Sequence, residues 1–250
     1  MWCKRLSWAG RTALVTGATA GIGEAVARQL ATLGADVVVH GRDIGRGARV
    51  VKEIQADGGT ARFVAADLSD PADVRRLAEA AGDVDILVNN AGIYLFGSTA
   101  DTDDATFDAH FAVNLRAPFI LVRELAPGMV RRGRGAIVNL STFGASVPGR
   151  GGGAYGASKA GLELLTKIWA DEYGPAGVRV NAVAAGPTRT PGTAAYGEFA
   201  EALGGVTTLG RVAEAEEIAN AVVFLATPAA GYVSGAVLPA HGGLQAVAPH

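Results

Sequence analysis

The first forty residues alternate between short apolar runs and an amphipathic segment. Residues 12–15 form one apolar run, and residues 35–40 form a second one that is rich in valine. Between them, apolar positions from Ile22 to Leu33 recur at the spacing of one helix face, and Gly34 follows as a stop signal. A valine-rich run is typical of a strand that is covered on both faces. The pattern therefore predicts a strand–helix–strand unit with parallel strands.

The same alternation continues to the end of the chain. Further strands are predicted at residues 61–66, 86–88, 136–140, 178–184 and 235–239. Helices are predicted at residues 46–57, at about 105–130 and at 155–173, and a short one is predicted where Ser69 and Pro71 provide a cap. Seven strands alternating with helices predict an α/β fold, a Rossmann-type doubly wound parallel sheet flanked by helices. No repeat or linker interrupts the pattern, so residues 1–250 are expected to form a single domain.

Composition narrows the classes of function. The formal net charge of −2 argues against a nucleic-acid partner, because phosphate binding requires a basic face. The single cysteine, Cys3, leaves no internal disulfide and fits a reducing compartment, so a cytoplasmic location is expected. No stretch has the roughly 18 uninterrupted apolar residues of a membrane span. The four histidines are scattered, so no metal site is expected.

Glycines mark the turn between the first predicted strand and its helix. Gly17, Gly21 and Gly23 stand within residues 16–23. Glycine lets such a turn bend tightly and approach a pyrophosphate, while the next helix presents free N–H groups to the phosphates. A P-loop is excluded, because no Gly-Lys-Ser/Thr follows. The turn therefore predicts a dinucleotide site.

The end of the second predicted strand bears on which dinucleotide binds. An acidic residue there would bind the ribose 2′-hydroxyl of NAD, whereas a nearby arginine would accommodate the 2′-phosphate of NADP. The chain has Gly41 and then Arg42 at this place, which favours NADP. Asp43 follows and leaves NAD open.

Candidate catalytic residues gather around the predicted helix at 155–173. Tyr155 and Lys159 share one helix face, and two hydroxyl residues, Ser141 and Thr142, end the strand before it. Hydride transfer to a carbonyl leaves charge on oxygen, so a proton donor must meet that oxygen. A neighbouring ammonium group is expected to lower the tyrosine pKa from its free value of about 10. Tyr155 is therefore the expected acid/base, and Lys159 is expected to tune it.

Four segments together resemble the classical short-chain dehydrogenase/reductase family, and within it the 3-oxoacyl-[acyl-carrier-protein] reductase-like members. They are the glycine turn, Asn-Asn-Ala-Gly at 89–92, the hydroxyl pair, and Tyr-x-x-x-Lys at 155–159. The resemblance covers nearly the whole chain. It places the catalytic hydroxyl at Thr142, where the family has a serine, unless an insertion in the loop 149–153 assigns the role to Ser141.

The resemblance also implies roles for single residues. It implies that Asn114 holds a water in a proton relay to Lys159. The cofactor-binding residues that it implies are Gly17, Thr19, Gly21, Ile22, Gly23, Arg42, Asp67, Leu68, Asn90, Ala91, Gly92, Tyr155, Lys159, Gly186, Thr188 and Thr190. An apolar substrate pocket is expected at Tyr94, Phe96, Phe143 and Val147, under a lid formed by residues 187–210.

These observations predict an NADP-preferring oxidoreductase that interconverts a ketone and a secondary alcohol. Its substrate is a small molecule, and the resemblance implies a homotetramer or homodimer that assembles through the last strand and the two long helices. Two alternatives stay open. One is an NAD-linked alcohol dehydrogenase, and the other is a dinucleotide-sensing protein without turnover, for which the threonine at position 142 is the one supporting feature.

Overall fold

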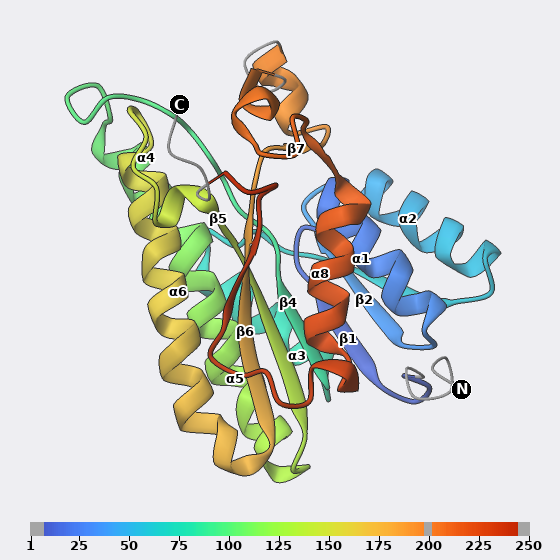
Figure 1. Ribbon diagram of the computed structural model, residues 1–250. Coiled ribbons are helices and arrows are strands. Elements are labelled where there is room, and N and C mark those ends of the chain that lie inside the picture. Colours follow the sequence, from blue (N-terminus) through green and yellow to red (C-terminus); the bar gives the residue numbers. More distant parts are fainter. Residues whose placement is uncertain (1–7, 198–201, 245–250) are drawn as a thin grey trace.

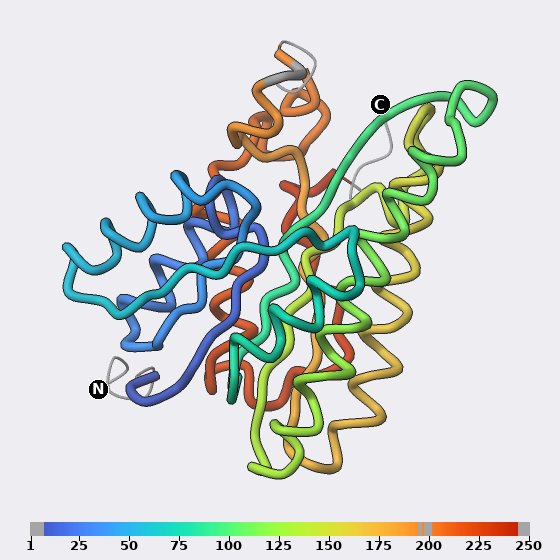
Figure 2. The backbone as a smooth tube through the Cα atoms, turned by 180° about the vertical axis from the view of Figure 1, so that it is seen from behind, coloured from blue at the N-terminus to red at the C-terminus, as the bar shows by residue number. Residues whose placement is uncertain are grey.

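Seven parallel strands form the central sheet of the computed structural model, which describes residues 8–197 and 202–244 (Figures 1 and 2). They are β1 (Thr12–Val15), β2 (Asp36–Gly41), β3 (Thr60–Ala65), β4 (Ile86–Asn89), β5 (Gly135–Thr142), β6 (Val178–Ala185) and β9 (Val237–Ala240). Their order across the sheet is β3-β2-β1-β4-β5-β6-β9. The chain starts near the middle and winds outward in both directions, which confirms the predicted doubly wound sheet.

Helices cover both faces of this sheet (Figure 1). One face carries α1 (Gly21–Thr32), α2 (Ile44–Ala56) and α8 (Ala215–Ala226), and the other carries α3 (Pro71–Ala81), α5 (Ala117–Arg131) and α6 (Gly153–Tyr173). Each face buries its own apolar cluster. Val15 belongs to one cluster and Leu14 to the other, because neighbouring residues on a strand point to opposite faces.

The helix predicted at about 105–130 is confirmed as one continuous helical run, with an irregular turn inside it. Helix α4 (Asp104–Phe111) passes into a π-helical segment, Ala112–Arg116, before α5 begins. Apolar residues flank this segment on both sides, so the sequence pattern did not reveal the wider turn. Single π-helical turns inside helices are frequent at functional sites. Here the π-helical segment contains Asn114, which is fully buried.

The cap of helix α3 also differs from the expectation. Pro71 starts the helix as predicted, but the capping carboxylate belongs to Asp70, which accepts a hydrogen bond from the Ala72 N–H at 2.8 Å. Ser69 donates its hydroxyl to Asp67 at 2.8 Å instead. A carboxylate interacts with the positive end of the helix more strongly than a hydroxyl does.

A small unpredicted strand pair lies beyond the carboxyl ends of the sheet, at the top of Figure 1. It consists of β7 (Thr188–Arg189) and β8 (Ala213–Glu214). Between them run 3-10 turns at Thr193–Tyr196 and Leu203–Val206. This stretch corresponds to most of the expected lid, of which residues 198–201 lie outside the described residues.

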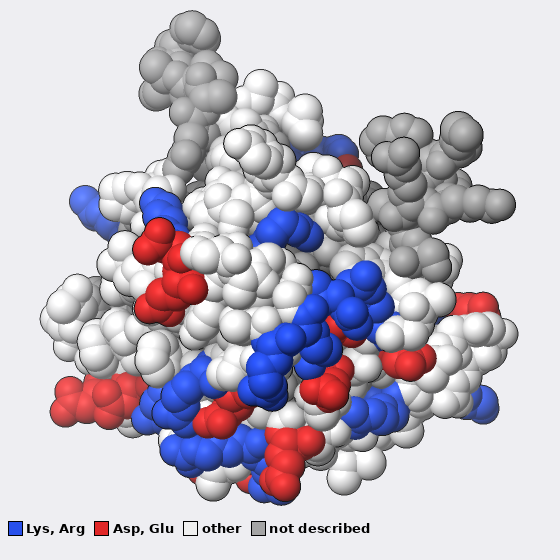
Figure 3. Space-filling model, turned by 90° about the horizontal axis from the view of Figure 1, so that it is seen from below, with Lys and Arg blue, Asp and Glu red and all other residues white. Residues whose placement is uncertain are grey.

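None of the helices in the described part of the chain combines the length and the apolar character needed to cross a bilayer. Seen from below, basic and acidic side chains lie next to one another on the surface (Figure 3). Ion pairs form between surface residues of the chain, such as Arg132 with Asp83 at 2.7 Å.

Candidate active site

A pocket of about 890 Å3 opens at the carboxyl edge of the sheet, where ligands bind in doubly wound folds. Every residue expected to bind the cofactor lines it. Ser141 and Thr142 line it too, as do the four residues expected around the substrate. Segments that are far apart in the sequence, and that carry the separate motifs, therefore form the walls of a single pocket.

The glycine turn forms the middle of the pocket. Gly17 has a φ of +64°, which favours glycine, and Asn90 Nδ2 donates to the Gly17 carbonyl oxygen at 3.1 Å. A methyl group on Gly23 would collide with that same oxygen and with the Asn90 amide. Helix α1 begins at Gly21, and no side chain of the described residues caps it. The turn thus offers a bare backbone and unpaired first-turn N–H groups, which fit a pyrophosphate.

The end of β2 forms one end of the pocket and carries Arg42, whose side chain is exposed. A methyl group on Gly41 would lie 2.5 Å from Thr19 Cγ2, so an acid at position 41 would require the Thr19 side chain to move. Asp43, which kept NAD open, caps helix α2 by accepting from the Arg46 N–H at 2.9 Å. It also forms an ion pair with the Arg46 side chain at 3.1 Å. These contacts favour a 2′-phosphate over a 2′-hydroxyl.

The two candidate hydroxyls end strand β5 but have different partners. The Thr142 side chain forms a hydrogen bond with Tyr155. Ser141 donates its hydroxyl to Glu163 Oε1 at 2.6 Å. Adjacent strand residues point to opposite sides, so only one of the two can meet the tyrosine. The geometry supports Thr142, and no insertion in the loop 149–153 needs to be invoked.

Asn114 and Lys159 meet behind Gly92. A methyl group on Gly92 would lie 3.1 Å from Asn114 Oδ1 and 3.3 Å from Lys159 Nζ. Lys159 is buried and donates to the Leu140 carbonyl oxygen at 2.7 Å. The Asn114 amide accepts from the Ile93 N–H at 2.9 Å and donates to the Ile93 carbonyl at 3.0 Å. Asn114 therefore anchors the segment after β4 and does not itself line the pocket.

The pKa of Tyr155 moves in the opposite direction to the one expected from the sequence. Burial raises the pKa of the Tyr155 phenol to about 12, and the hydrogen bond with Thr142 lowers it only in part. Burial lowers the pKa of Lys159 to about 8. Desolvation disfavours the charged form of each group and is the largest cause of both shifts. At neutral pH Tyr155 is a protonated phenol, which suits a proton donor.

Sequence reasoning missed two buried histidines beside this pocket. His40 ends strand β2 and lines the pocket wall. His110 is fully buried; its Nε2 accepts from the Leu95 N–H at 3.1 Å, and its ring centre lies 6.2 Å from that of Tyr155. Each was visible in the sequence as a polar residue inside an apolar element. The described residues contain no group of three or more His, Cys, Asp or Glu that could hold a metal ion.

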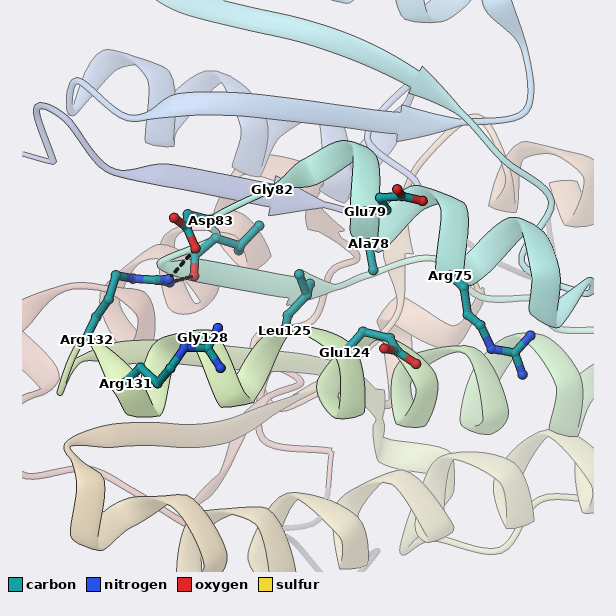
Figure 4. Close-up of a pocket in the computed structure, with 11 residues that line it drawn as sticks. Arg75, Ala78, Glu79, Gly82, Asp83, Glu124, Leu125, Gly128, Arg131 and Arg132 are labelled. Atoms are coloured by element: carbon teal, nitrogen blue, oxygen red, sulfur yellow. Dashed lines mark hydrogen bonds and ion pairs between the residues drawn. The ribbon is translucent and has the colours of Figure 1, made fainter.

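A second pocket, of about 360 Å3, lies between α3 and α5 near the amino end of β4 (Figure 4). Arg132 reaches from the end of α5 to Asp83 at 2.7 Å and to Asp85 at 3.5 Å. None of the candidate catalytic or cofactor-binding residues lines it. The proposed chemistry therefore belongs to the larger pocket.

Comparison with known proteins gives the class. A family model described as Enoyl-(Acyl carrier protein) reductase matches residues 17–245. Galactitol 2-dehydrogenase (L-tagatose-forming) of Cereibacter sphaeroides is 39% identical and aligns over 94% of each chain. A solved short chain dehydrogenase/reductase family protein is 50% identical, with a TM-score of 0.91 over 97% of this chain and 100% of that one.

A solved 3-oxoacyl (acyl-carrier-protein) reductase from Agrobacterium tumefaciens C58, with NADP bound, is 32% identical, with a TM-score of 0.92 over 97% of both chains. The chain therefore belongs to the short-chain dehydrogenase/reductase family of NAD(P)-dependent oxidoreductases. This confirms the resemblance that the sequence motifs carried.

Proposed function

We propose that the protein is an NADP-preferring oxidoreductase that interconverts a ketone and a secondary alcohol. One observation carries the proposal. Tyr155 and the buried Lys159 line the same pocket as a glycine turn that is too closely packed for side chains, and Tyr155 is hydrogen-bonded to Thr142. The close packing at Gly41 and the engagement of Asp43 support NADP over NAD. The Agrobacterium relative has NADP bound.

The residues of this chain supply the proton chemistry. NADP, when bound there, supplies or accepts a hydride. Tyr155 gives the proton to the substrate oxygen or takes it back, and its raised pKa of about 12 keeps the phenol protonated at neutral pH, so that a proton is there to give. Thr142 orients the same oxygen through its hydroxyl. Lys159 stands one helical turn away and favours the phenolate once the proton has left. Asn114 would hold a water on the path to Lys159.

A carbonyl screen tests this proposal directly. The purified protein is mixed with NADPH or NADH and with a panel that includes ketoses and β-ketoacyl thioesters, and the loss of reduced nicotinamide absorbance is followed. We expect at least one ketone to be reduced, faster with NADPH. A preference for NADH would favour the NAD-linked alternative. NADPH binding without turnover of any ketone would favour the dinucleotide-sensing alternative.

Substitution of the two strand-end hydroxyls distinguishes their roles. Thr142→Ala removes a hydroxyl that is hydrogen-bonded to Tyr155, so kcat/KM for the best ketone of the screen should fall by about 10²-fold. Thr142→Ser keeps the hydroxyl and should keep most of the activity. Ser141→Ala removes a hydroxyl that bonds Glu163, so its effect should be within a few-fold. Equal losses in Thr142→Ala and Ser141→Ala would contradict the assignment.

Substitution of Arg42 tests the cofactor preference. Arg42→Ala should weaken NADPH binding by roughly 10- to 100-fold, the range expected for a hydrogen bond to a charged group. NADH binding should change little, because NADH lacks the 2′-phosphate. Calorimetric titration of both cofactors measures this difference. Arg75→Ala, on helix α3 and outside the pocket, serves as the control. A uniform effect on both cofactors would end the NADP preference.

We include the segment 187–210 in the proposal as a substrate lid. Thr190 packs against the glycine turn, where a methyl group on Gly21 would lie 3.1 Å from it, and Gly192 abuts the Tyr94 hydroxyl. Leu203, within the second 3-10 turn, also lines the pocket. Slower hydrogen exchange in this segment on addition of NADPH and ketone would support a lid, and unchanged exchange would count against it.

Exposed apolar side chains support assembly of like chains. Phe119 on α5 is 45% exposed, and Leu164 and Ile168 on α6 are 60% and 41% exposed, whereas Leu162 and Trp169 belong to the core. Burying such side chains against a second copy would be favourable. Light scattering should therefore give the mass of a dimer or tetramer, and a monomeric mass would rule this out.

A further inference from the structure

His40 is a polar residue at the end of a valine strand, and the chemistry above gives it no role. It is only 2% exposed and lines the pocket between the glycine turn and the end of β3. A buried imidazole without hydrogen-bond partners would cost free energy, so the hydrogen bonds of the His40 ring indicate its role.

The His40 ring joins two walls of the pocket. Its Nδ1 accepts a hydrogen bond from the Gly17 N–H at 3.2 Å, and its Nε2 donates to the Ala66 carbonyl oxygen at 3.2 Å. Its own carbonyl accepts from the Ala18 N–H at 2.8 Å. Asn90 Nδ2 donates to the Gly17 carbonyl oxygen at 3.1 Å. The N–H and the carbonyl group of Gly17 are therefore both hydrogen-bonded to side chains of other segments, His40 in β2 and Asn90 directly after β4.

This arrangement requires a neutral ring with its proton on Nε2. Burial lowers the pKa of His40 to about 4, while the bond to Ala66 raises it in part. Two charged residues act on the ring: Arg42 lowers the pKa and Asp67 raises it. The imidazole is therefore neutral at physiological pH, and Nδ1 is free to accept from Gly17.

We propose that His40 is a positioning residue for the dinucleotide, because it fixes the Gly17 peptide in the shape that the pyrophosphate meets. The inference rests on the proposed function, since it presumes that this pocket binds NADP. Gly17, at a φ of +64°, has more backbone freedom than any other residue type would have. A turn that is already ordered loses less entropy on binding, so the contact to His40 raises cofactor affinity through the Gly17 backbone.

Two substitutions separate the two hydrogen bonds of the ring. An asparagine amide oxygen stands about where Nδ1 is, so His40→Asn keeps an acceptor for Gly17 and loses the bond to Ala66. A glutamine amide nitrogen stands about where Nε2 is, so His40→Gln does the opposite. Calorimetric titration with NADPH, well below the melting temperature, measures the affinity of each variant. We expect His40→Asn to bind within about threefold of wild type and His40→Gln about tenfold more weakly.

A stability control separates positioning from folding. Thr166→Val removes buried hydrogen bonds to Asn139 and Leu162, outside the pocket. It should lower the melting temperature and leave NADPH affinity unchanged. His40→Leu, which loses both ring contacts, should lower NADPH affinity at least as much as His40→Gln does.

The outcomes are distinct. Equal NADPH affinity in His40→Asn and His40→Gln, or a weaker His40→Asn, would overturn the role of His40 while the proposed function stands. The role would also be overturned if NADPH affinity fell in proportion to the loss of melting temperature in every variant, Thr166→Val included. A wild-type protein that binds neither NADPH nor NADH would overturn the proposed function, and this inference with it.

Discussion

Replacing Tyr155 by phenylalanine is expected to lower kcat for ketone reduction by about 10³-fold or more, because it removes the one proposed proton donor. The aromatic ring itself should stay in place. Its neighbours Tyr94 and Phe96 lie edge-on to the ring, with ring centres at 6.4 and 5.9 Å, and these ring contacts do not depend on the hydroxyl. The measurement is turnover of NADPH with the best ketone of the screen.

Binding and folding serve as the controls for Tyr155→Phe. NADPH affinity should stay near that of wild type, because the glycine turn and Arg42 are untouched. The melting temperature should change little, since phenylalanine fills the same volume. A variant that kept wild-type turnover would remove Tyr155 from the mechanism. Loss of NADPH binding alongside turnover would show instead that the phenol helps to hold the cofactor.

The second large effect is expected at Gly23, where alanine should destabilise the protein by up to about 2 kcal/mol and abolish NADPH binding. Helix propensity alone predicts a gain of roughly 1 kcal/mol for this change. The added methyl group, however, would collide with the Gly17 carbonyl oxygen and the Asn90 amide. Overpacking against fixed atoms costs about 1–3 kcal/mol, and backbone cannot move aside as a flexible side chain can. Steric repulsion should therefore outweigh propensity.

Denaturant unfolding and NADPH titration measure the effect of Gly23→Ala. Gly174 offers a matched control, because it has a φ of −56° and no atom lies within 4 Å of a methyl group added there. Gly174→Ala should leave stability equal or slightly higher and leave NADPH binding intact. If both alanine variants behaved alike, the close packing of the glycine turn would not be what the site depends on.

Much of the candidate site followed from local sequence. Residues at the ends of parallel strands meet at one edge, so Gly17, Asn90, Thr142 and Gly186 could be assigned to one pocket from their places along the chain alone. Tyr155 and Lys159 needed only helical spacing to share a face. The alternation of strands and helices was equally clear, because strands that are covered on both faces are apolar throughout.

Other features depended on contacts between distant segments. The partner of Ser141 is Glu163 on another element, so the choice between two adjacent hydroxyls required the orientation of the strand end. The π-helical segment around Asn114 depends on where Ile93 lies, since the side chain satisfies both backbone groups of that residue. The spacing of apolar residues along a helix does not reveal such a distant partner.

Patterns a few residues long were enough to predict the succession of strands and helices along the chain, the glycine turn and the residues at the carboxyl edge. Contacts between distant segments were needed to see which of those residues touch, in which direction the Tyr155 pKa shifts, and that His40 meets Gly17. The reason is physical: desolvation and hydrogen bonding depend on what surrounds a group in space, and those neighbours come from parts of the chain far away in sequence.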